Sequence, residues 1–168
     1  MLPHNAAIPV PWRMEELKRD FGDPFRLILP DGTIDASWQQ EILTTVDLPF
    51  AIPLGWDKSM SVTRLRCHKK AAAVFEQAFR ELEARRLESL IHSFGGCYAF
   101  RAKRRNHELS THCWGLAVDL NPETNPFGAA GDMSPEVVEV FTSLGFEWGG
   151  SWEGPARDPM HFQYCRGY

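Results

Sequence analysis

Two short segments of this sequence alternate apolar residues with small or polar ones, which is the pattern of a β-strand that buries one face. The apolar positions are Leu116, Val118 and Leu120 in the first segment, and Met160, Phe162 and Tyr164 in the second. The opposite faces carry Gly115, Ala117 and Asp119 in the first segment, and His161 and Gln163 in the second. Because the neighbours of Asp119 are small, we expect space for something bulky above its carboxylate. We therefore expect two strands that each present a possible ligand on the side away from the core.

Two other segments repeat apolar residues at three- and four-residue steps, which predicts amphipathic helices. The first runs from about Lys69 to Leu87, with a stripe formed by Ala71, Val74, Phe75, Ala78, Phe79 and Leu82. The second follows Ser134, whose side chain can cap it, has Pro135 at its first position and closes at Gly145. Its buried stripe is formed by Val137, Val140, Phe141 and Leu144.

The rest of the chain gives shorter signals. We expect a helix around Met14 to Phe21, a turn at Asp31-Gly32, and a strand from Leu90 to Phe94 that ends at Gly95-Gly96. Prolines interrupt the first sixty residues repeatedly, and no chemistry is assigned there. With 168 residues and no internal repeat, the economical interpretation is a single α+β domain.

Charge and cysteine content exclude several classes of protein. The formal net charge of -4 argues against nucleic acid as the main partner, because phosphate binding needs a concentrated positive surface. No stretch approaches 18 apolar residues, and the N-terminus lacks the pattern of a secretory signal, so we expect synthesis in the cytoplasm and no membrane partner. The cysteines form no CxxC pair and are expected to be free buried thiols: Cys67, Cys97, Cys113 and Cys165.

One combination of residues suggests metal chemistry. His112 lies just before the first strand, so the two strands could bring His112, Asp119 and His161 together. Two imidazoles and one carboxylate suit Zn²⁺, and three protein ligands leave a fourth position for water, as in catalytic zinc sites. Asp158 is the candidate base, because Pro159 can turn the chain and aim Asp158 and His161 inward. A lone His or Asp is more often structural, so the hypothesis depends on the combination.

Two motifs carry a family resemblance. The run from Ser110 to Asp119 matches SxHxxGxAxD in full, and Asp158-Pro159-Met160-His161-Phe162 follows it, after Trp148-Gly149-Gly150. These motifs resemble those of the VanY and D-alanyl-D-alanine carboxypeptidase group of zinc peptidases, which includes many bacteriophage endolysins. The resemblance covers about residues 62–164. It implies a small α+β fold shared with hedgehog-type domains, with an antiparallel sheet and flanking helices.

The resemblance also implies roles for individual residues. By position, His112, Asp119 and His161 are the zinc ligands, and Asp158 is the catalytic base at a place where many relatives have Glu. His68 and His107 are not needed as ligands.

Further roles concern the substrate. Family members carry an arginine upstream of the first motif that polarises the scissile carbonyl, and a guanidinium suits that task. Arg101 best matches that place, with Arg104 and Arg105 as competitors. Ser110 either binds a substrate carboxylate or caps the turn before the strand. Trp114, Trp148 and Trp152 either wall the cleft or fill the core, and Trp114 and Trp152 are the candidates for binding substrate.

The resemblance implies cleavage of peptide bonds in peptidoglycan stem peptides, by an L-alanyl-D-glutamate endopeptidase or a D,D-carboxypeptidase. We expect a monomeric phage lysis enzyme that reaches the cell wall by holin-type release or virion delivery. The alternative is an inactive, zinc-stabilised module that binds the cell wall or belongs to the virion.

Overall fold

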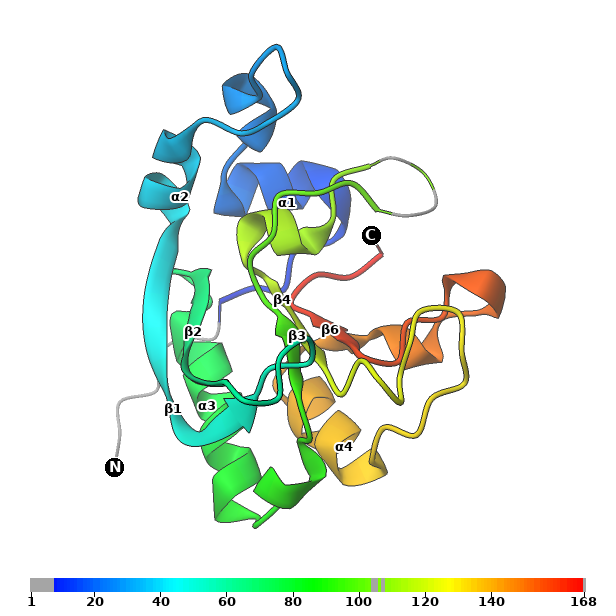
Figure 1. Ribbon diagram of the computed structural model, residues 1–168. Coiled ribbons are helices and arrows are strands. Elements are labelled where there is room, and N and C mark those ends of the chain that lie inside the picture. The colour runs from blue at the N-terminus through cyan, green and yellow to red at the C-terminus, as the bar shows by residue number, and fades with distance from the viewer. Residues whose placement is uncertain (1–7, 104–105, 107, 168) are drawn as a thin grey trace.

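Two antiparallel sheets organise the chain within residues 8–103, 106 and 108–167, the part that the computed structural model describes. A hairpin is formed by β1 (Leu43–Pro53) and β2 (Ser61–His68). The other sheet has the order β3-β4-β6-β5 and is formed by β3 (Phe94–Gly96), β4 (Ala117–Leu120), β5 (Glu147–Trp148) and β6 (His161–Gln163). Figure 1 shows the hairpin beside the four-stranded sheet.

The helices of the described residues complete an α+β fold, so the predicted fold class is confirmed. They are α1 (Arg13–Phe21), α2 (Ala36–Ile42), α3 (Ala72–Ala84) and α4 (Pro135–Ser143). Short 3-10 turns connect them: η1 (Pro24–Leu27), η2 (Glu88–Leu90), η3 (Thr111–Trp114), η4 (Gly149–Ser151) and η5 (Gly154–Ala156). The predicted helices near residues 14–21, 69–87 and 135–145 all exist.

Helix α4 packs against one face of the four-stranded sheet, and α3 packs against α4 and against β1 of the hairpin. Phe79 of α3 meets Phe141 of α4 edge to face at 5.9 Å, and Phe141 stacks on Phe162 of β6 at 4.5 Å. Such aromatic contacts add to the free energy of burying these rings. The predicted cap is present, because the Ser134 hydroxyl accepts a hydrogen bond from the backbone N–H of Glu136. The apolar face of the sheet is thus covered, and its other face is left for the side chains that alternate with Phe162.

The first sixty residues, to which the sequence pattern assigned no chemistry, contact the turn η3 and hold it in place. The Trp38 indole N–H donates to the carbonyl of Cys113 at 2.9 Å, and Trp38 is fully buried. The Trp114 indole N–H donates to the carbonyl of Gly22 at 2.8 Å. These long-range contacts tie the N-terminal helices to the segment that contains His112.

Two local predictions were wrong. The strand expected over Leu90 to Phe94 runs instead over Phe94–Gly96, because residues 88–90 form the turn η2. Gly115 lies outside β4: it has a φ of 64° and closes η3, where a Cβ would lie 2.9 Å from the backbone nitrogen of His68. Gly95, where a Cβ would lie 2.9 Å from the Cβ of Asp119, is the glycine that leaves room beside this residue. The alternation of apolar and small residues around Gly115 suggested a strand, and such a pattern does not reveal that a residue ends a turn in the left-handed conformation.

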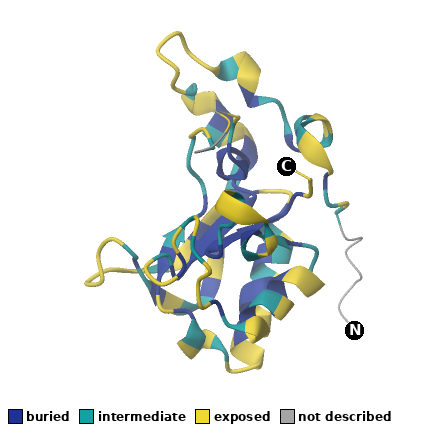
Figure 2. Cartoon of the chain, turned by 90° about the vertical axis from the view of Figure 1, so that its right-hand side faces the viewer, coloured by how far each residue is buried: buried dark blue, intermediate teal, exposed yellow. Residues whose placement is uncertain are grey.

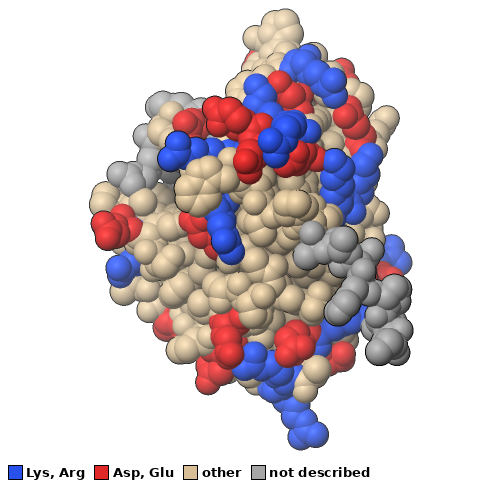
Figure 3. Space-filling model, turned by 180° about the vertical axis from the view of Figure 1, so that it is seen from behind, with Lys and Arg blue, Asp and Glu red and all other residues tan. Residues whose placement is uncertain are grey.

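Burial and surface charge agree with a folded domain that has one continuous core. Figure 2 shows buried residues in the central strands and exposed residues on the outer turns. On the face seen in Figure 3, Lys and Arg side chains lie among Asp and Glu side chains.

The expectation for the cysteines is confirmed, because all four are buried free thiols. Among the described residues, no helix has the length and apolar character needed to span a bilayer.

His68 is expected to make the protein less stable in mild acid. It is 1% exposed, its Nδ1 accepts from the N–H of Lys70, and its Nε2 donates to the carbonyl of Phe21 at 3.0 Å. Burial, together with the charge of Lys70, lowers the pKa of His68 to about 4. The unfolded chain therefore binds more protons between pH 6.5 and 4, and stability is lost as the pH falls through this range.

The expected loss attributable to His68 is about 2 kcal/mol of unfolding free energy between pH 7 and pH 5. Urea unfolding of the chelator-treated protein at both pH values measures it. His68→Gln should lose less stability on acidification than the wild type, whereas His92→Gln, at an exposed position, should behave like the wild type. Equal acid sensitivity of His68→Gln and the wild type would contradict this account.

Candidate metal centre

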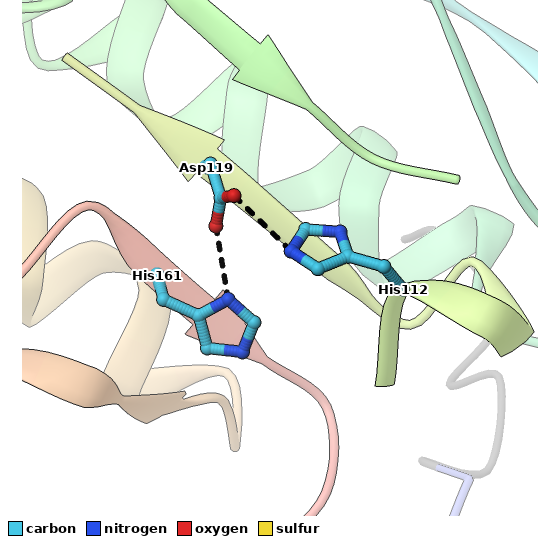
Figure 4. A group of neighbouring side chains, drawn as sticks. All are labelled: His112, Asp119 and His161. Atoms are coloured by element: carbon cyan, nitrogen blue, oxygen red, sulfur yellow. Dashed lines mark hydrogen bonds and ion pairs between the residues drawn. The ribbon is translucent and has the colours of Figure 1, made fainter. Parts of the chain in front are cut away.

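Three side chains from three elements converge on the open face of the four-stranded sheet. Asp119 and His161 are directly opposed partners of the antiparallel strands β4 and β6, so their side chains share one face. The turn η3 brings His112 to the same place. Figure 4 shows the carboxylate of Asp119 between the two imidazoles. One possible ligand atom from each residue lies within 4.8 Å of the others.

The two histidines face Asp119 through different nitrogens. His112 Nε2 lies 3.2 Å from Oδ2 of Asp119, and His161 Nδ1 lies 2.9 Å from Oδ1. The other nitrogen of His112, Nδ1, is 2.6 Å from the carbonyl of Cys97 and donates its proton there, because a carbonyl can only accept. In its neutral form, His112 would therefore offer the lone pair of Nε2 to a metal ion on the side of the carboxylate.

This arrangement fits a metal ion better than it fits a purely structural cluster. His112 Nε2 is buried yet has no hydrogen-bond partner of acceptable geometry, and such orphaned atoms are rare in native proteins. Two imidazoles and a carboxylate are the donors of catalytic zinc sites. A hydrogen bond from the second ring nitrogen to a carbonyl is the usual way in which a metal-binding histidine is oriented.

Electrostatics keep the carboxylate ionised. Burial opposes ionisation of Asp119, but the nearby His112 and His161 outweigh it and hold the pKa of Asp119 well below its usual value. Burial likewise opposes the charged form of His161, but the hydrogen bond and charge of Asp119 outweigh it and raise the pKa of His161. Asp119 is therefore an anion at neutral pH, as a metal ligand must be.

The cluster opens into a cleft of about 1210 Å³. Sequence-predicted residues that line it are Arg101, Ser110, Asp119, Trp152, Asp158 and His161. Arg101 Nη2 lies 3.9 Å from Oδ2 of Asp119. The Trp152 ring lies 5.5 Å from the ring of His161 and donates its indole N–H to Glu147. The predicted site residues thus meet at one opening, with the exceptions given below.

Asp158 is held beside His161 by its backbone. Its N–H donates to the carbonyl of Gly149 at 2.9 Å, and its own carbonyl accepts from the N–H of His161 at 3.0 Å. A Cβ on Gly149 would lie 2.5 Å from the carbonyl oxygen of Asp158, which explains the glycine in the Trp148-Gly149-Gly150 run. The charge of Asp158 contributes to the raised pKa of His161, so the two side chains interact.

Ser110 and Trp114 lie where their structural roles are clear. The Ser110 hydroxyl accepts from the N–H of His112 at 3.4 Å and caps η3, while the residue also borders the cleft. Trp114 is fully buried and packs against Trp38 at 6.5 Å, so the expectation that it binds substrate was wrong. The motif did not reveal which way the Trp114 side chain points, because η3 is a 3-10 turn. Side chains in such a turn do not alternate between two faces as they do in a strand. Arg104, Arg105 and His107 lie outside the described residues, as do residues 1–7.

Sequence reasoning missed several residues around the cluster. The carbonyl of Cys97 orients His112, but a backbone acceptor leaves no signal in the sequence. The side chains of Thr111 and Gln163 both approach His161 Nε2, at 3.4 Å and 3.1 Å. Gln163 could have been found, because it stands two positions after His161 on the same strand face.

The comparisons with known proteins agree with the motifs. Residues 103–164 match the model of a peptidase M15 family described as D-alanyl-D-alanine carboxypeptidase. The match is shorter than the expected 62–164, but it contains both motifs. No curated protein matches the chain. The resemblance to D-alanyl-D-alanine carboxypeptidases is thereby confirmed over the stretch that holds His112, Asp119 and His161.

Proposed function

We propose that this protein is a zinc peptidase that cleaves peptide bonds in peptidoglycan stem peptides. The observation that carries the proposal is the convergence of His112, Asp119 and His161 beside a cleft that Asp119, His161, Asp158 and Arg101 line. The peptidase M15 match over residues 103–164 supports the reaction class. Either L-alanyl-D-glutamate endopeptidase or D,D-carboxypeptidase activity is compatible with these observations.

The proposed roles follow from the side chains. His112, Asp119 and His161 hold the metal, which would acidify a water molecule and polarise the scissile carbonyl. Asp158 accepts the proton of the attacking water and passes it to the leaving amine, for which its place beside His161 in the cleft is suited.

Arg101 has a different proposed role. The Arg101 side chain borders the cleft and is 42% exposed, and its guanidinium lies near Asp119. It can therefore donate hydrogen bonds to the oxygen that becomes negative in the transition state. Cys113 fixes the Arg101 backbone, because its thiol lies 3.2 Å from the N–H and 3.1 Å from the carbonyl of Arg101. The side chain is therefore presented from an anchored segment.

The substrate is a component of the cell wall, so the enzyme has to act outside the cytoplasmic membrane. We propose release by a phage lysis system, of holin type or by virion delivery. The support for this role is the likeness of the motifs to those of endolysins.

The proposed activity is tested by incubating the zinc-loaded protein with purified cell walls and following new amino groups. We expect release by the wild type, none after treatment with a chelator, and recovery when Zn²⁺ is added back. Mass spectrometry of the products separates the two activities, because an endopeptidase exposes the amine of D-glutamate and a carboxypeptidase frees D-alanine. Zinc and cell-wall binding without new amino groups would favour the inactive module instead.

A further inference from the structure

We propose that Gln163 is a positioning residue that fixes which nitrogen of His161 is available to the metal. This inference rests on the proposed function, because it assumes that the cluster holds zinc. It concerns a residue to which neither the motif resemblance nor the family match gives a role. Gln163 follows His161 by two positions on β6, is 1% exposed and points to the same face of the sheet.

The orientation of the Gln163 amide is determined by its backbone partner. The Nε2 of Gln163 lies 3.1 Å from the carbonyl oxygen of Cys165. A backbone carbonyl can only accept a hydrogen bond, so the NH₂ group of the amide must face Cys165. The opposite orientation would bring two oxygens together in a buried place, which costs free energy. The amide oxygen Oε1 therefore faces the cluster.

Two groups then meet this amide oxygen. The hydroxyl of Thr111 donates to Oε1 of Gln163 at 3.1 Å, and Nε2 of His161 lies 3.1 Å from the same oxygen. Because Oε1 has only lone pairs, His161 must carry its proton on Nε2. Without a metal ion, Nδ1, which lies 2.9 Å from the ionised carboxylate of Asp119, can carry a second proton and donate it there. With Nε2 protonated, the neutral imidazole would offer the lone pair of Nδ1, and only Nδ1, to a metal ion.

The surroundings leave room for this contact and keep water away from it. Ala117 is the partner of Gln163 on β4, and its small side chain does not compete for the space above the strand pair. Thr111, His161 and Gln163 are each at most 5% exposed. A hydrogen bond in such a dry place is stronger than one at the surface, and a lost partner is not replaced by solvent.

The role predicts which substitutions matter. Gln163→Met keeps the length of the side chain but removes the acceptor, so the proton of His161 is no longer held on Nε2. Gln163→Glu keeps an acceptor for the imidazole and for Thr111. We therefore expect zinc affinity to fall by about 10- to 100-fold in Gln163→Met, the usual effect of losing such an outer partner. Gln163→Glu should bind zinc more tightly than Gln163→Met.

The experiment measures zinc affinity by competition with a chromophoric chelator, and melting temperature in the zinc-free state. A merely structural role of Gln163 would lower the melting temperature of the zinc-free protein without changing zinc affinity. A second measurement needs no variant: ¹⁵N-¹H correlation spectra of the zinc-loaded wild type should show His161 protonated on Nε2. This measurement keeps the inference testable if Gln163→Met does not fold.

The outcomes separate the inference from the function it rests on. Tight zinc binding by the wild type with unchanged affinity in Gln163→Met, or a proton on Nδ1 of His161, overturns the role of Gln163 and leaves the peptidase proposal standing. Failure of the wild type to bind zinc overturns the proposed function itself. Lower zinc affinity in Gln163→Met, with Nε2 protonated in the wild type, supports the role.

Discussion

Asp158→Ala is expected to lose cell-wall hydrolysis by about 10²- to 10⁴-fold, the usual contribution of a positioned acid or base. The carboxylate borders the cleft and acts electrostatically on His161, yet it is not one of the three clustered side chains. Its removal should therefore leave one zinc ion bound per chain. Measuring new amino groups and zinc content on the same preparation checks both parts.

Two further variants sharpen this test. Glu153→Ala, at an exposed position five residues earlier, is a matched control and should keep full activity. Asp158→Glu introduces the residue that many relatives have, and shows whether the shorter side chain limits the rate. Full activity in Asp158→Ala would remove this residue from the mechanism, and loss of zinc from it would mean that Asp158 supports the cluster instead.

The approach of Asp119 and His161 could be predicted from the sequence because it follows from strand alternation, whereas His112 is brought to them by the turn η3. In an antiparallel pair, opposed residues share a face, so Asp119 and His161 meet once β4 and β6 pair in register. The apolar residues between them, such as Val118 and Phe162, set that register by facing the helices. Helices α3 and α4 could also be predicted from the sequence, because the apolar residues of each recur at three- and four-residue steps.

Features that depend on long-range contacts could not be predicted in this way. Trp114 lies inside the first motif, but it is fully buried and donates its indole N–H to the carbonyl of Gly22, 92 positions earlier. Gly115 looked like a strand residue, but the end of η3 requires a positive φ there. The residue beside Asp119 that must be small is Gly95, on a strand whose bounds the pattern misplaced. For Trp114 and Gly95 the decisive neighbour is distant in sequence, whereas Gly115 ends a local turn that the strand pattern did not reveal.

Asp119→Asn is expected to abolish high-affinity zinc binding, and hydrolysis with it. The carboxylate is the one anion between two imidazoles, and its pKa is held well below the usual value by them, so it is ionised at neutral pH. An amide has nearly the same shape but supplies no charge to the cation. At free zinc 100-fold above the wild-type Kd, zinc should add about 2.7 kcal/mol to the unfolding free energy of the wild type. Asp119→Asn should gain almost none of it.

The matched control for this prediction is Asp47→Asn. Asp47 has an 89% exposed side chain on β1, where it pairs with Arg64 at the surface. Such exposed pairs contribute little to stability, so this variant should show the full zinc-dependent rise in melting temperature. Differential scanning calorimetry with and without Zn²⁺ measures the rise in all three proteins. An equal rise in Asp119→Asn and the wild type would mean that zinc binds elsewhere, because an ion held by His112 and His161 alone would lose its anionic ligand.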